Sequence, residues 1–327
     1  MQPGKKIAVA VLRGGPSSEY EISLKTGETV LKSLPDKYAG IDVFISLNGD
    51  WHVAGIRRSP ADILKHVDVA FVATHGQFGE DGKLQRTLEH VGVPFTGPKA
   101  LAAAMAMNKE LAKEALAKLG GRVKMPAHKT YTKKEAQSKG PEKIFREIPH
   151  PSIVKPLAAG SSLGVSVVRE YFDLEKALEG AFKHGDAVII EELIEGKEAS
   201  CGVIDEFRNE QNYGLLPIEV LLPKTSPFFD YEAKYGGSSV KLCPGNFDEE
   251  TKAVMQEMAK AVHRELGLRH YSRSDFIVHP KRGVFFLEVN TSPKVMPDAL
   301  LLKSLAAVGS SLSEFLDHVL TLALARK

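Results

Sequence analysis

The stretch Asp275-Phe-Ile-Val-His-Pro-Lys-Arg-Gly-Val-Phe-Phe-Leu-Glu-Val-Asn-Thr-Ser-Pro293 predicts two strands joined by the polar turn at residues 280–283. Side chains alternate along a strand, so Glu288 and Asn290 point to the same face. Pairing of the two strands brings Asp275 beside them. Two carboxylates and one amide, without cysteine or histidine, form a ligand set that suits Mg²⁺ and nucleotide phosphates. Single acidic residues at strand ends are usually just solvated, so the prediction rests on all three together.

The composition is that of an ordinary globular protein. A chain of 327 residues is expected to form two or three domains, and 43% hydrophobic with 26% charged residues argues against disorder. The net charge of +2 gives no indication of bulk nucleic-acid binding. The two cysteines, Cys201 and Cys243, are far apart, which disfavours a disulfide scaffold or a zinc site. The first apolar run has six residues, too few for a signal peptide or membrane span, so a cytoplasmic location is expected.

The first third of the sequence reads as a parallel α/β unit. Residues 7–12 are a continuous β-prone run that breaks at Arg13-Gly-Gly-Pro16. Ser18-Glu-Tyr-Glu21 has the spacing of a capping box, and a helix is expected from there to about residue 34. The glycine turn is compatible with a structural turn and with an anion-binding loop. Apolar runs at residues 41–45 and 67–73 alternate with helical segments, which is typical of a parallel sheet.

His75 follows the run at residues 67–73, at the sheet edge where ligands gather in open α/β sheets. It is therefore a candidate ligand contact, and a purely structural strand cap is the competing interpretation. Residues 93–95 are expected to form the last strand of this unit. Residues 101–119 are expected to form one long helix that ends at Gly120-Gly121.

Shorter β-prone runs with polar turns begin near residue 124 and indicate a second domain. Lys155 lies in a predicted strand, and a small-residue loop at residues 159–164 leads into another strand at 166–168. A lysine with flexible backbone donors suits a polyphosphate, although a simple hairpin tip would look the same. The glycines follow the lysine instead of preceding it, which disfavours a P-loop.

Residues 187–194 are expected to form a strand, followed by a turn and a second strand that ends at residue 204. The backbone of this segment suits an adenine edge and Glu198 suits a ribose, although glutamates on edge strands are usually just solvated. Residues 215–222 are expected to form a strand. The aromatic, glycine-containing segment at residues 228–237 is expected to be a flap. Helices are expected at about residues 248–266 and 300–324.

Five segments, in the same order, resemble the D-alanine–D-alanine ligase family of the ATP-grasp superfamily. They are Gly14-Gly-Pro-Ser-Ser-Glu-Tyr-Glu-Ile-Ser23, Thr74-His-Gly-Gln-Phe-Gly-Glu-Asp-Gly82, Val154-Lys-Pro156 with Gly160-Ser-Ser-Leu-Gly164, Phe229-Asp-Tyr-Glu-Ala-Lys-Tyr-Gly-Gly237, and Leu287-Glu-Val-Asn-Thr-Ser-Pro293. The resemblance implies an ATP-grasp fold, of mixed α/β and α+β class, preceded by an N-terminal Rossmann-like parallel α/β domain. The expected domains are residues 1–105 for substrate binding, 106–188 with the phosphate loop, and 189–327 with the flap and metal site.

The resemblance also implies a role for each matching residue. For ATP, these are the phosphate lysines Lys109 and Lys155, the phosphate-loop residues Ser161 and Ser162, the adenine linker Glu191, Leu193 and Ile194, and the ribose partner Glu198. Asp275, Glu288 and Asn290 are the implied ligands of Mg²⁺ or Mn²⁺, with two ions expected. The implied catalytic residues are Glu19, Ser161, Lys234, Tyr235 and Arg273, and the implied substrate contacts are Glu19, His75, Lys234, Tyr235, Arg273, Lys294 and Leu300.

The implied reaction transfers the γ-phosphoryl group of ATP to the carboxylate of one D-alanine. The amino group of a second D-alanine then displaces phosphate, giving D-alanyl-D-alanine for peptidoglycan precursor synthesis. Both steps gather negative charge and need water excluded. Family members that make the ester-ended product tend to carry phenylalanine at the position of Tyr235, so the resemblance implies that the Tyr235 hydroxyl favours peptide bond formation. A cytoplasmic homodimer is expected, without nucleic acid or membrane as a partner.

Two positions after Pro293 depart from the family pattern. Lys294 stands where the family usually has a glycine whose N–H meets the developing oxyanion, and lysine lacks glycine's backbone freedom. Ala299 stands where a serine helps to hold the second substrate's carboxylate, and one lost hydrogen bond to a charged group costs roughly 1.5–3 kcal/mol. Lys294 as a replacement carboxylate partner is a hypothesis. A related ATP-grasp ligase with another acceptor, and a degenerate nucleotide-binding protein without activity, are the alternatives.

Overall fold

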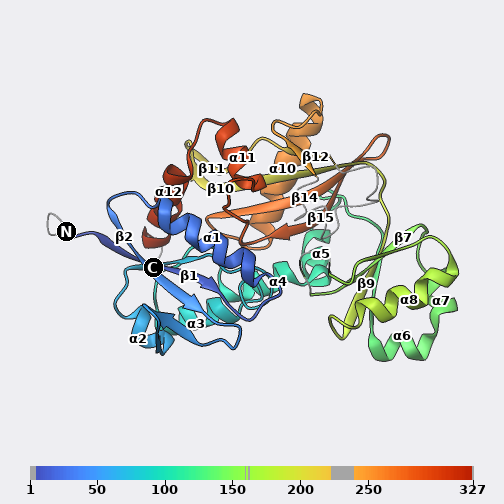
Figure 1. The fold of residues 1–327 in the computed structure, drawn as a ribbon. Helices are drawn as coiled ribbons and strands as arrows, with labels where there is room; N and C mark the ends of the chain where they lie inside the picture. The colour runs from blue at the N-terminus through green and yellow to red at the C-terminus, as the bar shows by residue number, and fades with distance from the viewer. Residues whose placement is uncertain (1–4, 159, 161–162, 222–238, 326–327) are drawn as a thin grey trace.

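The computed structural model describes residues 5–158, 160, 163–221 and 239–325. The strands of these residues form three sheets, and helices pack around them (Figure 1). In the described part of the chain, no helix combines the length and apolar character needed to cross a membrane. The three sheets and the helices around them agree with the mixed α/β and α+β class expected from the sequence.

The N-terminal sheet has five strands in the order β4-β3-β2-β1-β5. β1 pairs in parallel with β2 and β5, as expected, whereas the edge strands β3 and β4 are antiparallel. Residues 93–95 form an isolated bridge from Phe95 to Ala70 instead of the expected strand, because Pro94 has no N–H to donate. The elements are β1 Ile7–Gly14, α1 Tyr20–Ser33, β2 Tyr38–Ile45, β3 Trp51–Val53, β4 Ile56–Arg58, α2 Pro60–Leu64, β5 Val69–Val72 and α3 Lys83–Val91.

Helices cover both faces of this sheet (Figure 1). α1 and the last helix, α12 (Leu312–Ala325), pack on one face in a core that includes Val9, Phe71 and Phe315. The other face packs against α2 and α3 through residues such as Leu84. The first core also contains Tyr271 of the C-terminal sheet, so the beginning and the end of the chain share one hydrophobic core.

The central sheet has the order β6-β9-β7-β8 and a separate core with α6, α7 and α8. Its elements are β6 His128–Thr132, α6 Lys133–Lys139, α7 Pro141–Arg146, β7 Ser152–Pro156, β8 Ser166–Val168, α8 Tyr171–Ala181 and β9 Ala187–Glu192. The expected domain limit between residues 188 and 189 falls inside β9, so this sheet continues to Glu192. The domain limits themselves stay a prediction.

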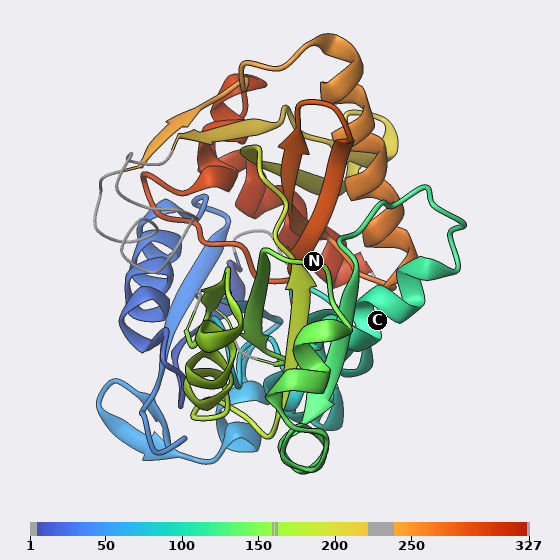
Figure 2. The same ribbon diagram turned by 90° about the vertical axis from the view of Figure 1, so that its right-hand side faces the viewer.

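The C-terminal sheet has the order β13-β12-β10-β14-β15, and β11 pairs with β10. Figure 2, viewed from the side of the central sheet, shows the β14–β15 hairpin above the central strands. β12 starts after Pro217, later than the start expected at residue 215, and residue 222, where that strand was expected to end, lies outside the described residues. The elements are β10 Lys197–Phe207, β11 Glu210–Gly214, β12 Ile218–Leu221, β13 Val240–Leu242, α10 Glu249–Glu265, β14 Tyr271–His279, β15 Gly283–Asn290 and α11 Leu300–Ala307.

The helix expected to be continuous at residues 101–119 is divided, and the helical C-terminus expected at residues 300–324 also contains two helices. Residues 101–119 form α4 (Ala100–Met107) and α5 (Lys109–Ala117), because the Asn108 side chain accepts the N–H groups of Glu110 and Leu111 and starts a new helix. This break makes Lys109 the first residue of α5. Residues 300–324 are likewise divided into α11 and α12, with Gly309 between them at a φ of +71°.

Candidate active site

The β14–β15 hairpin brings together the three oxygen-bearing side chains predicted from the sequence. Asp275 lies opposite Glu288, and a bulge follows Asp275. The Asn290 Nδ2 donates to Asp275 Oδ2 at 3.0 Å. The hairpin and the proximity of these side chains are confirmed, whereas their role as metal ligands stays a prediction.

Arg273 neutralises Asp275 from two residues earlier on the same strand. Its Nε and Nη2 atoms donate to the two Asp275 oxygens, each at 2.9 Å. Ser200 Oγ also donates to Asp275 Oδ1, at 2.6 Å. Burial lowers the pKa of the Arg273 guanidinium, but the charges of Asp275 and Glu288 outweigh this and raise the pKa. Arg273 therefore carries its positive charge in the buried site.

A buried ion-pair network joins the central sheet to α5. Glu191, with 1% of its side chain exposed, contacts Lys155 Nζ at 2.6 Å and Lys113 Nζ at 3.0 Å. Burial raises the pKa of Glu191, but the two lysines outweigh this and lower the pKa. Burial favours a lower pKa for Lys155, but the neighbouring Glu191 carboxylate has the larger effect, so the pKa of Lys155 is raised. Glu191 therefore holds Lys155 in its charged form.

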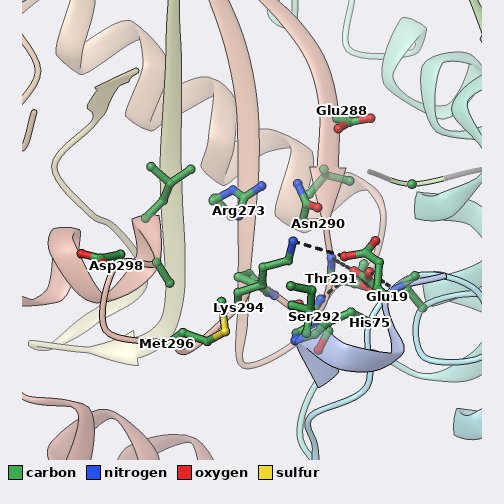
Figure 3. A pocket seen from close by; sticks show the side chains of 18 of the residues that line it. Glu19, His75, Arg273, Glu288, Asn290, Thr291, Ser292, Lys294, Met296 and Asp298 are labelled. Carbon is green, nitrogen blue, oxygen red and sulfur yellow. Dashed lines mark hydrogen bonds and ion pairs between the residues drawn. The ribbon is translucent and has the colours of Figure 1, made fainter. Parts of the chain in front are cut away.

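Two cavities meet beside this network. The smaller, of about 370 Å³, lies between the central and C-terminal sheets, and its lining includes the ATP-site residues Lys155, Glu191, Leu193, Ile194 and Glu198 predicted above. The larger, of about 800 Å³, is lined by residues of the N-terminal and C-terminal parts, including Glu19, His75, Arg273, Asn290 and Lys294 (Figure 3). Lys109, Glu288 and Leu300 line both cavities, and Lys109 Nζ lies 3.5 Å from Glu288 Oε2.

Glu19 lies immediately before α1 and faces the larger cavity, with 8% of its side chain exposed. Its Oε2 atom is 3.2 Å from Lys294 Nζ (Figure 3). The capping box expected from Ser18 is absent at this helix start: α1 begins at Tyr20, and the cap residue Glu19 makes no side-chain capping bond. Ser17 Oγ accepts the Glu19 N–H instead, which leaves the Glu19 carboxylate directed at Lys294.

His75 is buried, and both ring nitrogens bond within the protein. Nδ1 lies 2.9 Å from the Ser292 carbonyl oxygen, so it donates, and Nε2 accepts from Thr26 Oγ1 at 2.8 Å. Burial lowers the pKa of His75 to about 4, so the ring is neutral at pH 7. His75 lines the cavity, but its hydrogen bonds tie α1 to the turn after β15. A direct substrate contact stays a prediction.

Glu80 connects the loop after β5 to the turn after β15. Its carboxylate accepts the N–H groups of Gly76, Thr291 and Ser292 at 2.9–3.0 Å. Gly76 has a φ of +67°, and a Cβ atom there would lie 2.9 Å from Ser17 Oγ, so the turn requires glycine. The predicted metal strand β15 is thereby held against the strand end that carries His75.

Four predicted residues lie outside the described residues. They are Ser161 and Ser162 of the phosphate loop and Lys234 and Tyr235 of the flap. Their assignments stay predictions. Gly160, which is described, borders the larger cavity, where a Cβ atom would lie 3.0 Å from Glu19 Oε1.

The two departures from the family pattern both line the larger cavity. Lys294 does not have a positive φ angle, so a lysine fits this backbone without strain. Ala299 is the N-cap residue of α11 and makes no side-chain capping bond. Lys294 Nζ forms an ion pair with Glu19. The hypothesis that Lys294 binds an acceptor carboxylate stays a prediction.

The donor set fits the metal that the family resemblance implies. Asp275, Glu288 and Asn290 offer carboxylate and amide oxygens and neither sulfur nor imidazole, which suits Mg²⁺. Over residues 5–325, apart from the undescribed positions, no three His, Cys, Asp or Glu side chains gather as a metal-binding group. A metal site on this hairpin therefore depends on the Asn290 amide as its third protein ligand.

Several residues of the site were not identified from the sequence. Lys113 follows Lys109 by one helical turn, and that spacing on one helix face was the available signal. Glu80 belongs to the motif at residues 74–82 that carries the family resemblance, but the sequence alone indicated no role for it. Ser200 carries no signal of its own, because only the pairing of β10 with β14 places it opposite Asp275.

Comparison with known proteins identifies a family. The model described as D-ala D-ala ligase C-terminus matches residues 122–321, and the model described as D-ala D-ala ligase N-terminus matches residues 54–98. A D-alanine–D-alanine ligase from Syntrophobacter fumaroxidans is 35% identical over 321 residues, which covers 98% of each chain. One from Anaeromyxobacter sp. (strain K) is 36% identical over 315 residues, which covers 95% of each.

Solved structures agree with these matches. A D-Ala:D-Ser ligase from Enterococcus faecalis superimposes with a TM-score of 0.86 at 29% identity, covering 98% of this chain and 100% of that one. D-alanyl-alanine synthetase A from Vibrio cholerae O1 has a TM-score of 0.85 at 27% identity, with 98% and 99% covered. With both domains matched and relatives similar over nearly the full length, this chain belongs to the D-alanine–D-alanine ligase family and has the ATP-grasp fold.

Proposed function

We propose that this protein is an ATP- and Mg²⁺-dependent ligase that joins two D-alanine molecules through a D-alanyl phosphate. The observation that carries the proposal is the meeting of two cavities at Lys109 and Glu288, beside Arg273. ATP in the smaller cavity would present its γ-phosphoryl group to a D-alanine carboxylate in the larger one. The names of the relatives support D-alanine as the substrate.

The first step activates a carboxylate. An oxygen of the first D-alanine's carboxylate attacks the γ-phosphorus, and the bond to the leaving ADP breaks. Arg273, Lys109 and Lys155 gather positive charge around the transferred group, where a buried site makes that charge effective. Glu19 binds the substrate's ammonium and thereby aims its carboxylate at the phosphate.

The second step forms the peptide bond. The amine of the second D-alanine attacks the acyl carbon and loses a proton to solvent, and the bond from the acyl carbon to the phosphate oxygen breaks so that phosphate leaves. α11 begins at Leu300, which lines the larger cavity together with Ala299. The N–H groups of its first turn have no partner within the helix and are the proposed donors for the acceptor's carboxylate, since Ala299 offers no hydroxyl. Asp275, Glu288 and Asn290 would hold Mg²⁺, which would supply charge neutralisation for the phosphates. The mechanism requires no nucleophile from the protein.

The product, D-alanyl-D-alanine, is a precursor of peptidoglycan. The proposal includes two ions per site, a homodimer and a cytoplasmic location, as expected for this family. These three points rest on the family resemblance.

Phosphate release from ATP tests the proposal, with Mg²⁺ and a panel of D- and L-amino acids offered singly and in pairs. Release with D-alanine alone is expected. Release only when another acceptor is added would redirect the proposal to a related ligase, and no release with any amino acid would refute it. Glu288→Gln should remove activity while thermal unfolding stays close to that of the wild type.

A further inference from the structure

Lys241 supplies a positive charge at the end of the larger cavity where the acceptor is proposed to bind. It lies on the short strand β13 and lines this cavity. Its Nζ atom donates to the main-chain carbonyl oxygen of Asp298 at 2.9 Å, and the next residue, Ala299, is the N-cap of α11. The ammonium group is therefore held beside the first turn of α11.

This end of the cavity is distinct from the proposed donor end. Figure 3 shows Asp298 and Glu19 on opposite sides of Arg273. In the proposed mechanism, Glu19 binds the ammonium group of the first D-alanine and Arg273 stabilises the transferred phosphoryl group. A side chain bonded to Asp298 therefore lies on the acceptor's side of the reacting groups.

The charges around Lys241 favour an anion as its ligand. Burial lowers the pKa of Lys241, the Asp298 carboxylate opposes this, and the positive charges of Lys303 and Arg273 lower the pKa further. Lys303 also lines the cavity, and its N–H donates to the Ala299 carbonyl oxygen within α11. A carboxylate that binds here offsets both the burial of the ammonium group and its repulsion by neighbouring cations.

The bond to Asp298 is compatible with two roles for Lys241. An ammonium group has three N–H donors, and this bond uses one of them, so another can donate to a carboxylate oxygen of a ligand. Alternatively, Lys241 only holds the turn before α11 in place. The two roles differ in one measurable respect, because only the first makes the enzyme sensitive to the charge of the acceptor.

We propose that Lys241 is a specificity-determining residue of the acceptor subsite, where its ammonium group binds the carboxylate of the second D-alanine. This inference rests on the proposed function. It adds a charged side chain from β13 to the proposed main-chain donors of α11, at the position where Ala299 has no hydroxyl. An acceptor whose carboxylate is replaced by a neutral amide loses the charge-assisted part of this contact.

Competition between two acceptors tests the proposal. The full-length enzyme is incubated with ATP, Mg²⁺ and equal concentrations of D-alanine and D-alaninamide. D-alaninamide has no carboxylate to phosphorylate, so it serves only as acceptor: its amine attacks the acyl carbon of D-alanyl phosphate, loses a proton to solvent and expels phosphate. The products, D-alanyl-D-alanine and D-alanyl-D-alaninamide, are separated by chromatography and quantified by mass spectrometry. Both arise from the same acyl phosphate, so changes in the first step cancel from their ratio.

The wild type should form mainly D-alanyl-D-alanine. Lys241→Met removes the charge and should raise the share of the amide product relative to the wild type about 10-fold, as expected for the loss of one hydrogen bond to a charged group. Lys241→Gln should have a similar effect, although it keeps an N–H donor for the Asp298 carbonyl oxygen. Lys241→Arg keeps the charge and should give a ratio close to that of the wild type.

Lys252→Met is the matched control. Lys252 is a partly buried lysine on α10 that pairs with Glu249 and lines neither cavity, so its ratio should not change. Thermal unfolding establishes that each variant is folded, and Lys241→Gln gives an independent reading if Lys241→Met is unstable.

An unchanged product ratio in the folded Met or Gln variant would overturn the inference and leave the proposed function in place. A wild type that uses D-alaninamide as readily as D-alanine would do the same. A wild type that makes neither product would overturn the proposed function, and the inference with it.

Discussion

The buried Lys155–Glu191–Lys113 network offers the sharpest stability prediction. Glu191 and Lys113 are each 1% exposed, so replacing Glu191 by glutamine leaves a buried ammonium without its carboxylate. Truncation of one partner of a buried pair typically costs about 3–5 kcal/mol. Glu191→Gln should therefore lower the free energy of unfolding by about that amount. It should also raise the KM for ATP, because Lys155 loses its 2.6 Å contact.

The pH dependence of this deficit follows from the pKa shifts. Burial lowers the pKa of Lys113, and Glu191 opposes it, so removal of Glu191 lowers that pKa further. When the pKa of a lysine is lower in the folded than in the unfolded state, the unfolded state binds more protons, so the fold is destabilised at lower pH. This destabilisation decreases as the pH rises toward the unfolded-state pKa of about 10.4. The loss in the free energy of unfolding caused by Glu191→Gln, relative to the wild type, should therefore decrease between pH 7 and pH 10.

Urea unfolding at pH 7 and pH 10 is the assay. The double variant Lys113→Met, Glu191→Gln should recover much of the lost stability, since it replaces the buried charge with an apolar side chain. Glu142→Gln is the control, because its ion pair with Arg146 is exposed and should contribute little. A Glu191→Gln variant as stable as this control, or a double variant no better than the single one, would refute the reasoning.

Three further predictions concern single side chains. Burial raises the pKa of Asp205, but bonds from His263 and a backbone N–H outweigh this and lower it to about 2. Solvent screening reduces the corresponding contribution to stability to roughly 1–2 kcal/mol, which is present above pH 4. That contribution is lost as the pH falls from about 4 to 2, and the stability difference between the wild type and Asp205→Asn should vanish over the same range in acid titrations followed by circular dichroism. Ser200→Ala removes a donor to Asp275 and should raise the Mg²⁺ concentration needed for half-maximal activity by roughly 10-fold, whereas an unchanged requirement would argue against Asp275 as a ligand. Arg273→Lys keeps the charge but loses the two-pronged contact, so kcat should fall more than the KM for D-alanine rises, and equal effects on both would contradict a role in the transition state.

The β14–β15 hairpin was predictable because it depends on local rules. Strand alternation sets the face of Glu288 and Asn290, and a short turn forces the pairing that delivers Asp275. The parallel core of the N-terminal sheet followed from its apolar runs for similar reasons. The break at Asn108 was also readable in principle, since asparagine is a preferred N-cap, but the surrounding alanines and leucines favoured one continuous helix.

The contacts that assemble the site were not predictable, because their partners are remote in sequence. Glu191 meets Lys113 across 78 residues, and Glu80 binds the N–H groups of Thr291 and Ser292 more than 200 residues away. Lys294 was identified as unusual, but nothing local indicates that it faces Glu19. Such pairings depend on how the sheets are arranged in space, and no periodicity within one segment encodes that arrangement.

Transfer of an oxygen isotope from substrate to phosphate tests the central claim most directly. The enzyme is incubated with ATP, Mg²⁺ and D-alanine labelled with ¹⁸O in its carboxylate, and the released phosphate is analysed by mass spectrometry. An acyl phosphate formed where the two cavities meet requires one ¹⁸O atom in each phosphate released with a peptide product. Phosphate that carries no ¹⁸O, released while D-alanyl-D-alanine accumulates, would contradict the proposed mechanism.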